Sequence, residues 1–209
     1  MHDTLAHPSK QSMLQMIRNS SFNKNVPNFI INKIYDNCEW CFKFKKSKPT
    51  FKVSPPMSHD FNQTVTMDLK IWPKKGKIIL YIIDMFSRLT HASVIKDKRP
   101  ESVIKVFVDE WILRWGAPDA ILTDNGTEFV NSKMTAVCEA YSIKMINSGA
   151  HSPNQCGLVE SNHKYTDRMV EILMDQKPNM SFEEALRSAV FAKNMLINVY
   201  GFSPLQIVG

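Results

Sequence analysis

Apolar residues recur at helical spacing in the first part of the chain. One helix is predicted over Lys10–Asn19 with Ser9 as its N-cap, and its apolar face comprises Met13, Met16 and Ile17. A second helical pattern precedes Cys38 and comprises Phe29, Ile30, Ile34 and Tyr35. A segment of about 50 residues with so few large apolar groups makes a marginal core, so a stabilising staple is expected.

After residue 58 the pattern changes to short runs rich in β-branched and apolar residues, which predict strands. The predicted strands are Thr64–Lys70, Lys77–Asp84, Leu89–Ile95, Asp119–Asp124 and Ile143–Asn147. The predicted helices are Glu101–Trp115, Phe129–Tyr141, Gly157 to about Met174, and Phe182–Val199 with a Ser181/Glu184 capping box. Three strands followed by alternation predict an α/β fold, a mixed five-stranded sheet with helices on both faces.

Composition excludes several classes of protein. The chain has 209 residues, 44% hydrophobic and 22% charged, which is ordinary for a globular protein and excludes collagen, fibres and wholesale disorder. No apolar run approaches the ~18–20 residues of a membrane helix. The N-terminus lacks the pattern of a secretory signal, and four cysteines are too few for a disulfide scaffold. We expect a nuclear or otherwise intracellular protein that is neither secreted nor bound to a membrane.

The net charge of +6 is concentrated in residues 1–58, which hold nine Lys and Arg against three Asp and Glu. The densest run consists of Lys43, Lys45, Lys46 and Lys48. Such a cluster among aromatic residues suits a polyanion, because each neutralised phosphate releases counterions; a solvated basic linker is the alternative. Three prolines predict a linker over residues 49–58, which would separate a helical module (1–48) from a larger domain (59–209).

The helical module carries a candidate metal site. His2 and His7 precede its helices, and Cys38 and Cys41 follow them as a CxxC pair. Two imidazoles and two thiolates make a closed tetrahedral set for one structural zinc ion, and metal binding would supply the folding free energy that the small core lacks. The alternative is a pair of surface histidines with two buried cysteines.

Three acids form a second candidate site. Asp68 and Asp124 lie at the ends of predicted strands, and Glu160 lies in a predicted helix. Converging carboxylates would repel one another, so a divalent cation is the natural counterion, and hard oxygen ligands suit Mg²⁺ or Mn²⁺. Taken singly, strand-end acids more often cap turns. Glu128, four residues after Asp124, is interpreted as such a turn acid or as an outer group of the site.

These motifs resemble the retroviral and LTR-retrotransposon integrases. Thirty-five residues separate Asp124 from Glu160, as in the D,D-35-E core of that family, and the His2/His7/Cys38/Cys41 set resembles the zinc domain that precedes it. The segments that flank the acids also resemble the family, and they are Tyr81–Arg88, Trp115–Thr123, Asp124–Phe129 and Ser152–Glu160. The resemblance implies an RNase H-like core in which Asp68, Asp124 and Glu160 bind two catalytic Mg²⁺ ions.

The resemblance also implies function and partners. It implies a polynucleotidyl transferase that trims 3′ DNA ends and joins element DNA to target DNA, acting as a homo-oligomer. DNA contacts are expected from the basic run and from Asn125 and Lys164, the latter one turn beyond Glu160. His163 stands where many family members carry Asn.

The chain begins one residue before His2 and ends without room for the family's C-terminal DNA-binding domain, so we expect either a polyprotein fragment with a truncated zinc module or a domesticated or decayed copy. A decayed copy would bind DNA without strand transfer. An RNase H-type nuclease of the same fold is a third alternative.

Overall fold

The structure, a computed structural model, describes residues 2–20, 26–44, 58–73, 75–147, 153–196 and 201–209. Two compact units divide the chain: Val53–Ser161 form one, and Met1–Lys52 with Asn162–Gly209 form the other. The predicted basic residues Lys45, Lys46 and Lys48, and nearly all of the predicted linker, lie outside the described residues.

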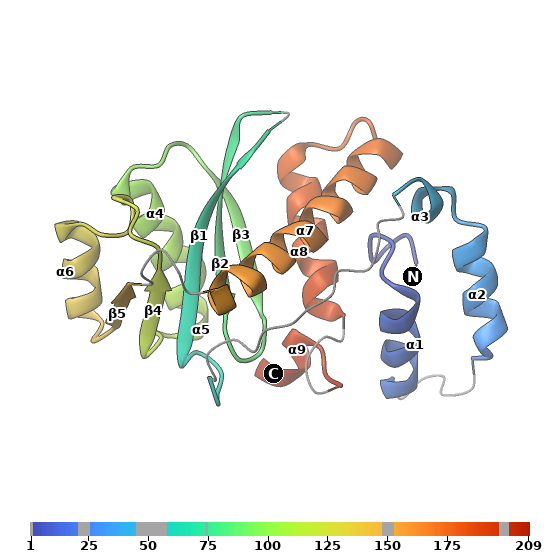
Figure 1. The fold of residues 1–209 in the computed structure, drawn as a ribbon, viewed down its shortest axis with the longest axis horizontal. Helices are drawn as coiled ribbons and strands as arrows, with labels where there is room; N and C mark the ends of the chain where they lie inside the picture. The colour runs from blue at the N-terminus through green and yellow to red at the C-terminus, as the bar shows by residue number, and fades with distance from the viewer. Residues whose placement is uncertain (1, 21–25, 45–57, 74, 148–152, 197–200) are drawn as a thin grey trace. The chain divides into compact units, whose positions relative to one another are not determined.

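The unit Val53–Ser161 is built on a five-stranded mixed sheet (Figure 1). Its strands are β1 (Thr64–Trp72), β2 (Lys77–Asp84), β3 (Thr90–Ile95), β4 (Ala120–Thr123) and β5 (Lys144–Asn147). The order is β3-β2-β1-β4-β5. The pairs β1/β2 and β2/β3 are antiparallel, whereas β1/β4 and β4/β5 are parallel. This confirms the predicted mixed sheet.

The apolar runs that predicted the strands form the core of this unit. β2 is buried on both of its faces, since the consecutive residues Ile79 to Ile83 are all 0% exposed. Consecutive side chains of a strand point to opposite faces of the sheet, so a strand of consecutive apolar residues is buried only where both faces of the sheet are covered. The parallel pairing of β1 with β4 places the carboxyl ends of these two strands at the same edge of the sheet.

Helices connect the strands of this unit. One long helix consists of α4 (Pro100–Val106), a π-helical segment (Phe107–Ile112) and α5 (Leu113–Trp115), and it buries Val103, Phe107 and Trp111. It ends at Gly116, whose φ of 86° lies in the left-handed region that favours glycine. The next helix, α6 (Ser132–Ala140), is capped by the Asn131 side chain. The sequence predicted both helices but not the π-helical segment.

The other unit is helical in its described residues. It contains α1 (Lys10–Asn19), α2 (Asn28–Asp36), α3 (Glu39–Lys43), most of α7 (Pro153–Gln176), α8 (Phe182–Met195) and α9 (Pro204–Val208). The predicted N-cap Ser9 and the capping box of Ser181 and Glu184 are confirmed. α8 is shorter than predicted, because Leu196 already has extended backbone. The sequence analysis missed α3 and α9, which have five residues each.

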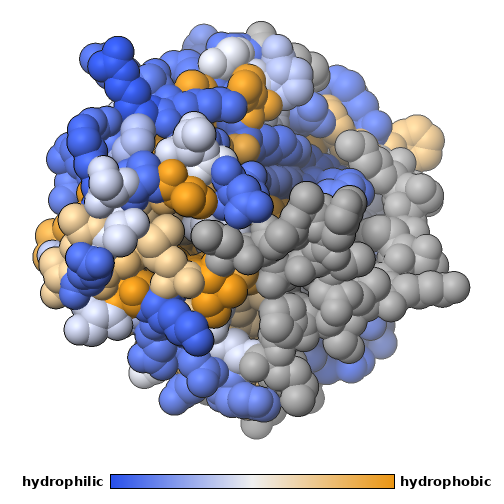
Figure 2. Space-filling view, turned by 60° about the vertical axis from the view of Figure 1, so that its left-hand side comes forward, coloured by the Kyte–Doolittle hydropathy of each residue, from blue (hydrophilic) through white to orange (hydrophobic). Residues whose placement is uncertain are grey.

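The surface carries both hydrophobic and hydrophilic side chains. Hydrophobic residues gather among hydrophilic ones on one face of the molecule (Figure 2). The large apolar side chains exposed in the sheet-containing unit are Ile71, Leu113, Val130, Tyr141 and Ile146. Within the described part of the chain, none of the helices is both long and apolar enough to cross a membrane.

Candidate functional site

Asp68 and Asp124 are brought together by strand register. Thr66 of β1 stands opposite Leu122 of the parallel strand β4, so the same register continued by two residues puts Asp68 opposite Asp124. Asp124 directly follows the last residue of β4 and is exposed, whereas Asp68 is half-buried within β1. Two acids that are 56 positions apart in the sequence are therefore neighbours at one edge of the sheet.

The surroundings of Asp68 disfavour its ionised form. Burial and then the negative charge of Asp124 raise the pKa of the Asp68 carboxyl to about 6. Lys70 and the backbone N–H of Leu69 lower it, and Glu128 adds a smaller upward effect. A divalent cation would reverse this balance, because it replaces repulsion between carboxylates with attraction to a common charge.

The Glu128 carboxylate lies near that of Asp124, on the same side of Gly126. A Cβ atom placed on Gly126 would lie 2.7 Å from Glu128 Oε2 and 3.0 Å from Asp124 Oδ1, so both carboxylates pack against the Gly126 Cα. The Gly126 N–H donates to Asp124 Oδ1 at 2.9 Å and fixes that carboxylate. A third acid thus adjoins Asp124, and a methyl group at position 126 would displace the carboxylates of Glu128 and Asp124.

Glu160 is placed differently. It is exposed on α7, and its carboxylate does not gather with those of Asp68 and Asp124 into a ligand cluster among the described residues. Asn125 is exposed immediately after Asp124, and Lys164 is exposed on α7. His163 is buried, with 9% of its surface exposed, so its side chain lies away from solvent.

Two imidazoles and two thiols meet in the helical unit. His7 Nδ1 lies 3.1 Å from both His2 Nε2 and Cys38 Sγ, and His2 Nε2 lies 3.4 Å from Cys41 Sγ. One ligand atom from each residue lies within 4.8 Å of all the others. Tetrahedral zinc, with bonds of ~2.0–2.1 Å to nitrogen and ~2.3 Å to sulfur, requires ligand–ligand distances of about 3.3–3.8 Å. The donor set therefore fits one zinc ion.

The backbone before the first helix is strained to bring the two histidines together. Ala6 and His7 have φ of 50° and 56°, the left-handed region that non-glycine residues rarely adopt. The His7 N–H donates to the His2 carbonyl at 3.0 Å, which closes the turn. Strain of this kind persists where the surrounding structure demands it, and here it serves the convergence of the ligands.

Burial favours the uncharged forms of two of the ligands, His2 and Cys41. Burial and the neighbouring His7 lower the pKa of His2, so its imidazole is neutral, which is the form that binds metal. Burial, and then interaction with Cys38, raise the pKa of the Cys41 thiol to about 11, while Tyr35 and Arg168 lower it. Metal binding must therefore release a proton from Cys41.

Groups around the ligands orient them. The Tyr35 ring packs edge-on against the His2 ring with centroids 5.1 Å apart, and its hydroxyl donates to the Pro8 carbonyl. The Asp3 carboxylate lies 3.8 Å from His7 Nε2, on the side of the ring opposite the ligand atom. A carboxylate in this position is the usual partner of a metal-bound histidine.

Of the four predicted basic contacts, Lys43 is the one that the structure describes. Its ammonium pairs with Asp175 of α7 and lies over the rings of Trp40 and Phe44 at 5.3 and 5.6 Å from their centroids. The charge of Lys43 is thus partly engaged within the unit. Its predicted contact with DNA stays a prediction, as do those of Lys45, Lys46 and Lys48.

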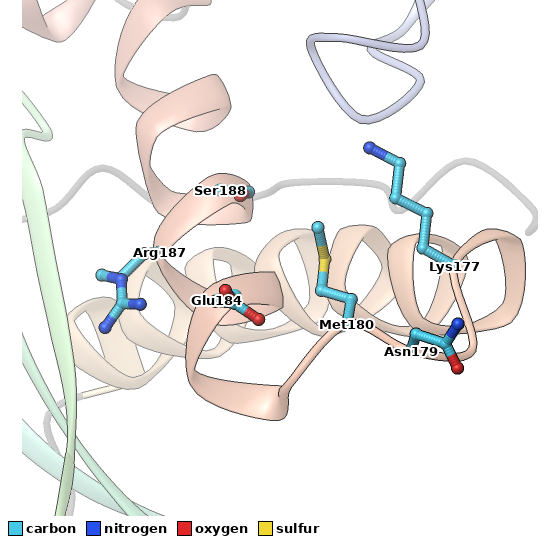
Figure 3. A pocket seen from close by; sticks show the side chains of 6 residues that line it. All are labelled: Lys177, Asn179, Met180, Glu184, Arg187 and Ser188. Atoms are coloured by element: carbon cyan, nitrogen blue, oxygen red, sulfur yellow. The ribbon is translucent and has the colours of Figure 1, made fainter.

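A hollow at the turn between α7 and α8 is separate from these clusters (Figure 3). It has a volume of about 500 Å³ and is lined by Lys177, Asn179, Met180, Glu184, Arg187 and Ser188. The Glu184 carboxylate accepts from the Ser181 N–H and hydroxyl, so it is committed to capping α8. None of the predicted catalytic or metal-binding residues lines this hollow.

The sequence analysis missed Tyr35 and Arg168 as residues that act on the His/Cys cluster, whereas it placed Glu128 as a turn acid or an outer group of the acid site. Tyr35 was assigned only to a helix face, although its position three residues before Cys38 is a signal that it could touch the metal site. Arg168 lies 127 positions after Cys41, and no local pattern connects the two. The closeness of Glu128 to Asp124 was visible in the sequence, but its orientation depends on the turn at Gly126.

The sheet order and the acids on β1 and after β4 define the class of the larger unit, which has the RNase H-like fold of integrase catalytic cores. Residues 58–153 match the family model described as Integrase core domain. The chain is similar to retroviral and retrovirus-related Pol polyproteins and shares its fold with solved integrase cores.

Known proteins show the extent of the similarity. The Retrovirus-related Pol polyprotein from transposon 412 of Drosophila melanogaster is 32% identical over 109 residues, 51% of this chain and 9% of that polyprotein. The HTLV-2 integrase catalytic core domain in complex with magnesium has a TM-score of 0.65 and 24% identity, and the match covers 73% of this chain and 100% of that one.

A chain of the simian T-cell lymphotropic virus intasome in complex with PP2A regulatory subunit B56 gamma has a TM-score of 0.68 and 19% identity, and the match covers 88% of this chain and 67% of that one. At these identities the solved structures show a shared fold. The chain spans about a tenth of the length of the curated polyproteins it matches.

Proposed function

We propose that the protein is a DNA polynucleotidyl transferase that processes the 3′ ends of element DNA and joins them to target DNA. The observation that carries the proposal is the closeness of Asp68 and Asp124, which the register of β1 and β4 and the effect of Asp124 on the pKa of Asp68 both indicate, within a segment that matches the integrase core domain. A buried acid whose pKa is raised by burial and by a neighbouring acid is a frequent mark of a functional site.

In this proposal Asp68 and Asp124 hold the divalent ions, and Glu160 on α7 completes the set. Two bound Mg²⁺ ions would activate the attacking hydroxyl and stabilise the leaving 3′ oxygen. Asp68 must be ionised to act as a metal ligand. The hydrogen bond from the Gly126 N–H would hold the Asp124 carboxylate in place for metal binding. Glu128 adds negative charge beside the pair without being a ligand.

The N-terminal residues would hold a structural zinc ion through His2, His7, Cys38 and Cys41. The short distances between their nitrogen and sulfur atoms support this. The partner is DNA, contacted by Asn125 directly after Asp124, by Lys164 one turn after Glu160, and by the basic run Lys43–Lys48. We further propose a homo-oligomer. Related integrase cores occur in trimeric and dimeric forms, and a similar chain belongs to an intasome. The site of action would be the nucleus or a virus-like particle.

The proposal is tested by strand transfer and 3′ processing on a labelled duplex with Mg²⁺ or Mn²⁺. Asp68→Asn, Asp124→Asn and Glu160→Gln should each abolish both reactions. The losses should not add in double variants, because a site that lacks one ligand already fails to hold the metals in register. Asp119→Asn, at the other end of β4, and Glu139→Gln, exposed on α6, are matched controls that should keep activity.

Two outcomes would contradict parts of the proposal. If Glu160→Gln kept parental strand transfer while Glu128→Gln abolished it, the third ligand would be Glu128. If the chain bound DNA but showed no metal-dependent cleavage or joining, the integrase-derived binding protein would be the better description.

A further inference from the structure

Two bonds connect α7 to the end of α3, the helix that contains Cys41, and to Phe44 directly after it. Both helices are labelled in Figure 1. Arg168 Nε donates to the backbone carbonyl of Phe44 at 3.1 Å, and Asp175 pairs with Lys43. Arg168 and Asp175 are seven residues apart, close to two helical turns, so they lie on the same side of α7. The end of the segment that contains the zinc ligands is therefore fastened to one face of this helix.

The charge of Arg168 also acts on the ligand cluster. Burial raises the pKa of the Cys41 thiol and of the Tyr35 hydroxyl, and the positive charge of Arg168 opposes this shift in both. Cys41 is 5% exposed, and the Tyr35 ring packs against His2. The hydrogen bond to Phe44 therefore holds the Arg168 charge where it acts on one metal ligand and on the residue that packs against another.

The guanidinium group suits this position for a physical reason. Arginine presents five N–H donors in a rigid plane and keeps its charge at any physiological pH, so one group can satisfy a carbonyl and also face a thiolate sulfur. A lysine would supply the charge without the planar array of N–H donors. Groups that contact metal ligands in this way affect metal affinity nearly as strongly as some ligands do.

We propose that Arg168 is a positioning residue of the zinc centre, and that Arg168 and Asp175 together latch this centre onto α7 so that metal binding stabilises the helix. The proposal rests on the zinc site put forward above. Because α7 also carries Glu160 and Lys164, the latch would make the order of the proposed catalytic helix depend on the structural metal.

The first measurement is zinc affinity of the full chain by competition with a chromophoric chelator. Arg168→Met should weaken zinc binding by about 10-fold, the lower end of the range for residues that support metal ligands. Arg168→Lys should fall between Met and the parent, since it keeps the charge alone. Arg187→Met removes a comparable exposed arginine from α8 and should leave the affinity unchanged.

The second measurement separates positioning from general stability. Zinc should slow amide hydrogen exchange across residues 165–175 in the parent, and this protection should be reduced in Arg168→Met and in Asp175→Asn. The Co²⁺-substituted parent and Arg168→Met should both give tetrahedral spectra, with a shifted sulfur-to-metal charge-transfer band in the variant. Zinc-free circular dichroism shows whether each variant is folded, and Arg168→Lys provides the test if Arg168→Met is not.

The outcomes distinguish this inference from the proposed function. If the parent chain binds no zinc, the zinc centre fails and the latch fails with it, while the acid site is untouched. If the parent binds zinc but Arg168→Met binds it equally well, with the same band and the same protection of residues 165–175, the latch alone is overturned. A lysine variant weaker than the methionine variant would also overturn it.

Discussion

At the scale of single residues, the chemistry of Asp68 depends on its neighbours. An isolated aspartate in water is ionised at neutral pH, but Asp68 is half-buried in β1 beside Asp124. Its pKa of about 6 means that the folded protein holds this proton more tightly than the unfolded chain does. Stability without magnesium must therefore fall as the pH rises from the ordinary aspartate pKa to about 6.

Asp68→Asn should remove this cost because the amide carries no charge. We expect the free energy of unfolding without magnesium to rise by about 1–3 kcal/mol near pH 7.5, and to change little near pH 4, where Asp68 is protonated in the folded protein. Urea unfolding at the two pH values, with zinc present, measures this. Asp119→Asn is the control, and an equal gain in both variants would show that the effect is not specific to Asp68.

Strand-transfer activity should depend on the same ionisation of Asp68, but it should rise with pH where stability without magnesium falls. Ligation requires the ionised form of Asp68, so strand transfer at limiting Mg²⁺ should rise as the pH passes through about 6. A higher concentration of Mg²⁺ should move this rise to lower pH, because metal competes with the proton. A pH profile unaffected by magnesium concentration would argue against Asp68 as a metal ligand.

At Gly126, the absence of a Cβ atom leaves room for the carboxylates of Asp124 and Glu128. A methyl group there would meet the Glu128 and Asp124 carboxylates at 2.7 and 3.0 Å. Gly126→Ala should therefore fold but lose roughly 10-fold or more in strand transfer, since displacing a catalytic group by ~1 Å can cost ~100-fold. Adding Glu128→Ala makes room and should restore part of the activity; full activity in the single variant would contradict this account.

At the scale of elements, a buried hydrogen-bond network centred on Asp84 joins three elements of the sheet-containing unit. Asp84, at the end of β2, is 0% exposed and accepts from the Ser87 N–H and hydroxyl and from the Asn62 N–H, all at 2.6–2.9 Å. Asn62 bonds in turn to the Trp111 indole and to the carbonyls of Trp115 and Gly116. The start of β1, the end of β2 and the end of α5 are thereby joined.

Asp84→Ala should remove the acceptor of the Asn62 N–H and of the Ser87 N–H and hydroxyl inside the core. We expect a loss of about 2–4 kcal/mol in the free energy of unfolding, because buried donors without partners cost far more than exposed ones. Thermal or urea unfolding measures it. Asp97→Ala is a matched control, since Asp97 accepts similar bonds from Ser102 and Arg99 at an exposed turn, and its loss should be much smaller.

At the scale of the whole molecule, the sheet-containing unit and the helical unit depend on different sources of stability. The first has a core of fully buried strands, whereas the N-terminal residues rely on a few apolar side chains such as Met13 and Ile31 around the ligand cluster. Small cores of this size commonly need a metal to fold.

Chelation of zinc should therefore reduce helical content in residues 2–44 and leave the five strands protected. Hydrogen exchange followed by peptide analysis measures both in one experiment. Zinc affinity should also increase with pH, since the Cys41 thiol, with its pKa of about 11, releases a proton on binding. Purified protein without zinc, or a Cys38→Ser/Cys41→Ser variant with unchanged exchange, would contradict a folding role for the metal.

The sequence by itself determined the features that are periodic or closely spaced. β2 and α1 follow the predicted ranges because alternation, apolar runs and caps act over a few residues. The His2/His7/Cys38/Cys41 set could be read from spacing because a CxxC pair and two nearby histidines have few other uses. The spacing of Asp124 and Glu160 pointed to the integrases, and residues 58–153 match the Integrase core domain model.

Tertiary structure decided which distant residues meet. The parallel register of β1 and β4 sets Asp68 beside Asp124, and the packing of α7 brings Arg168 to the Phe44 carbonyl, from where its charge acts on Cys41. No local pattern encodes these contacts, because a strand or helix can bury the same apolar face in several registers and against several partners. Only the packing of the complete chain selects one register, and with it the charges that each acid and thiol experiences.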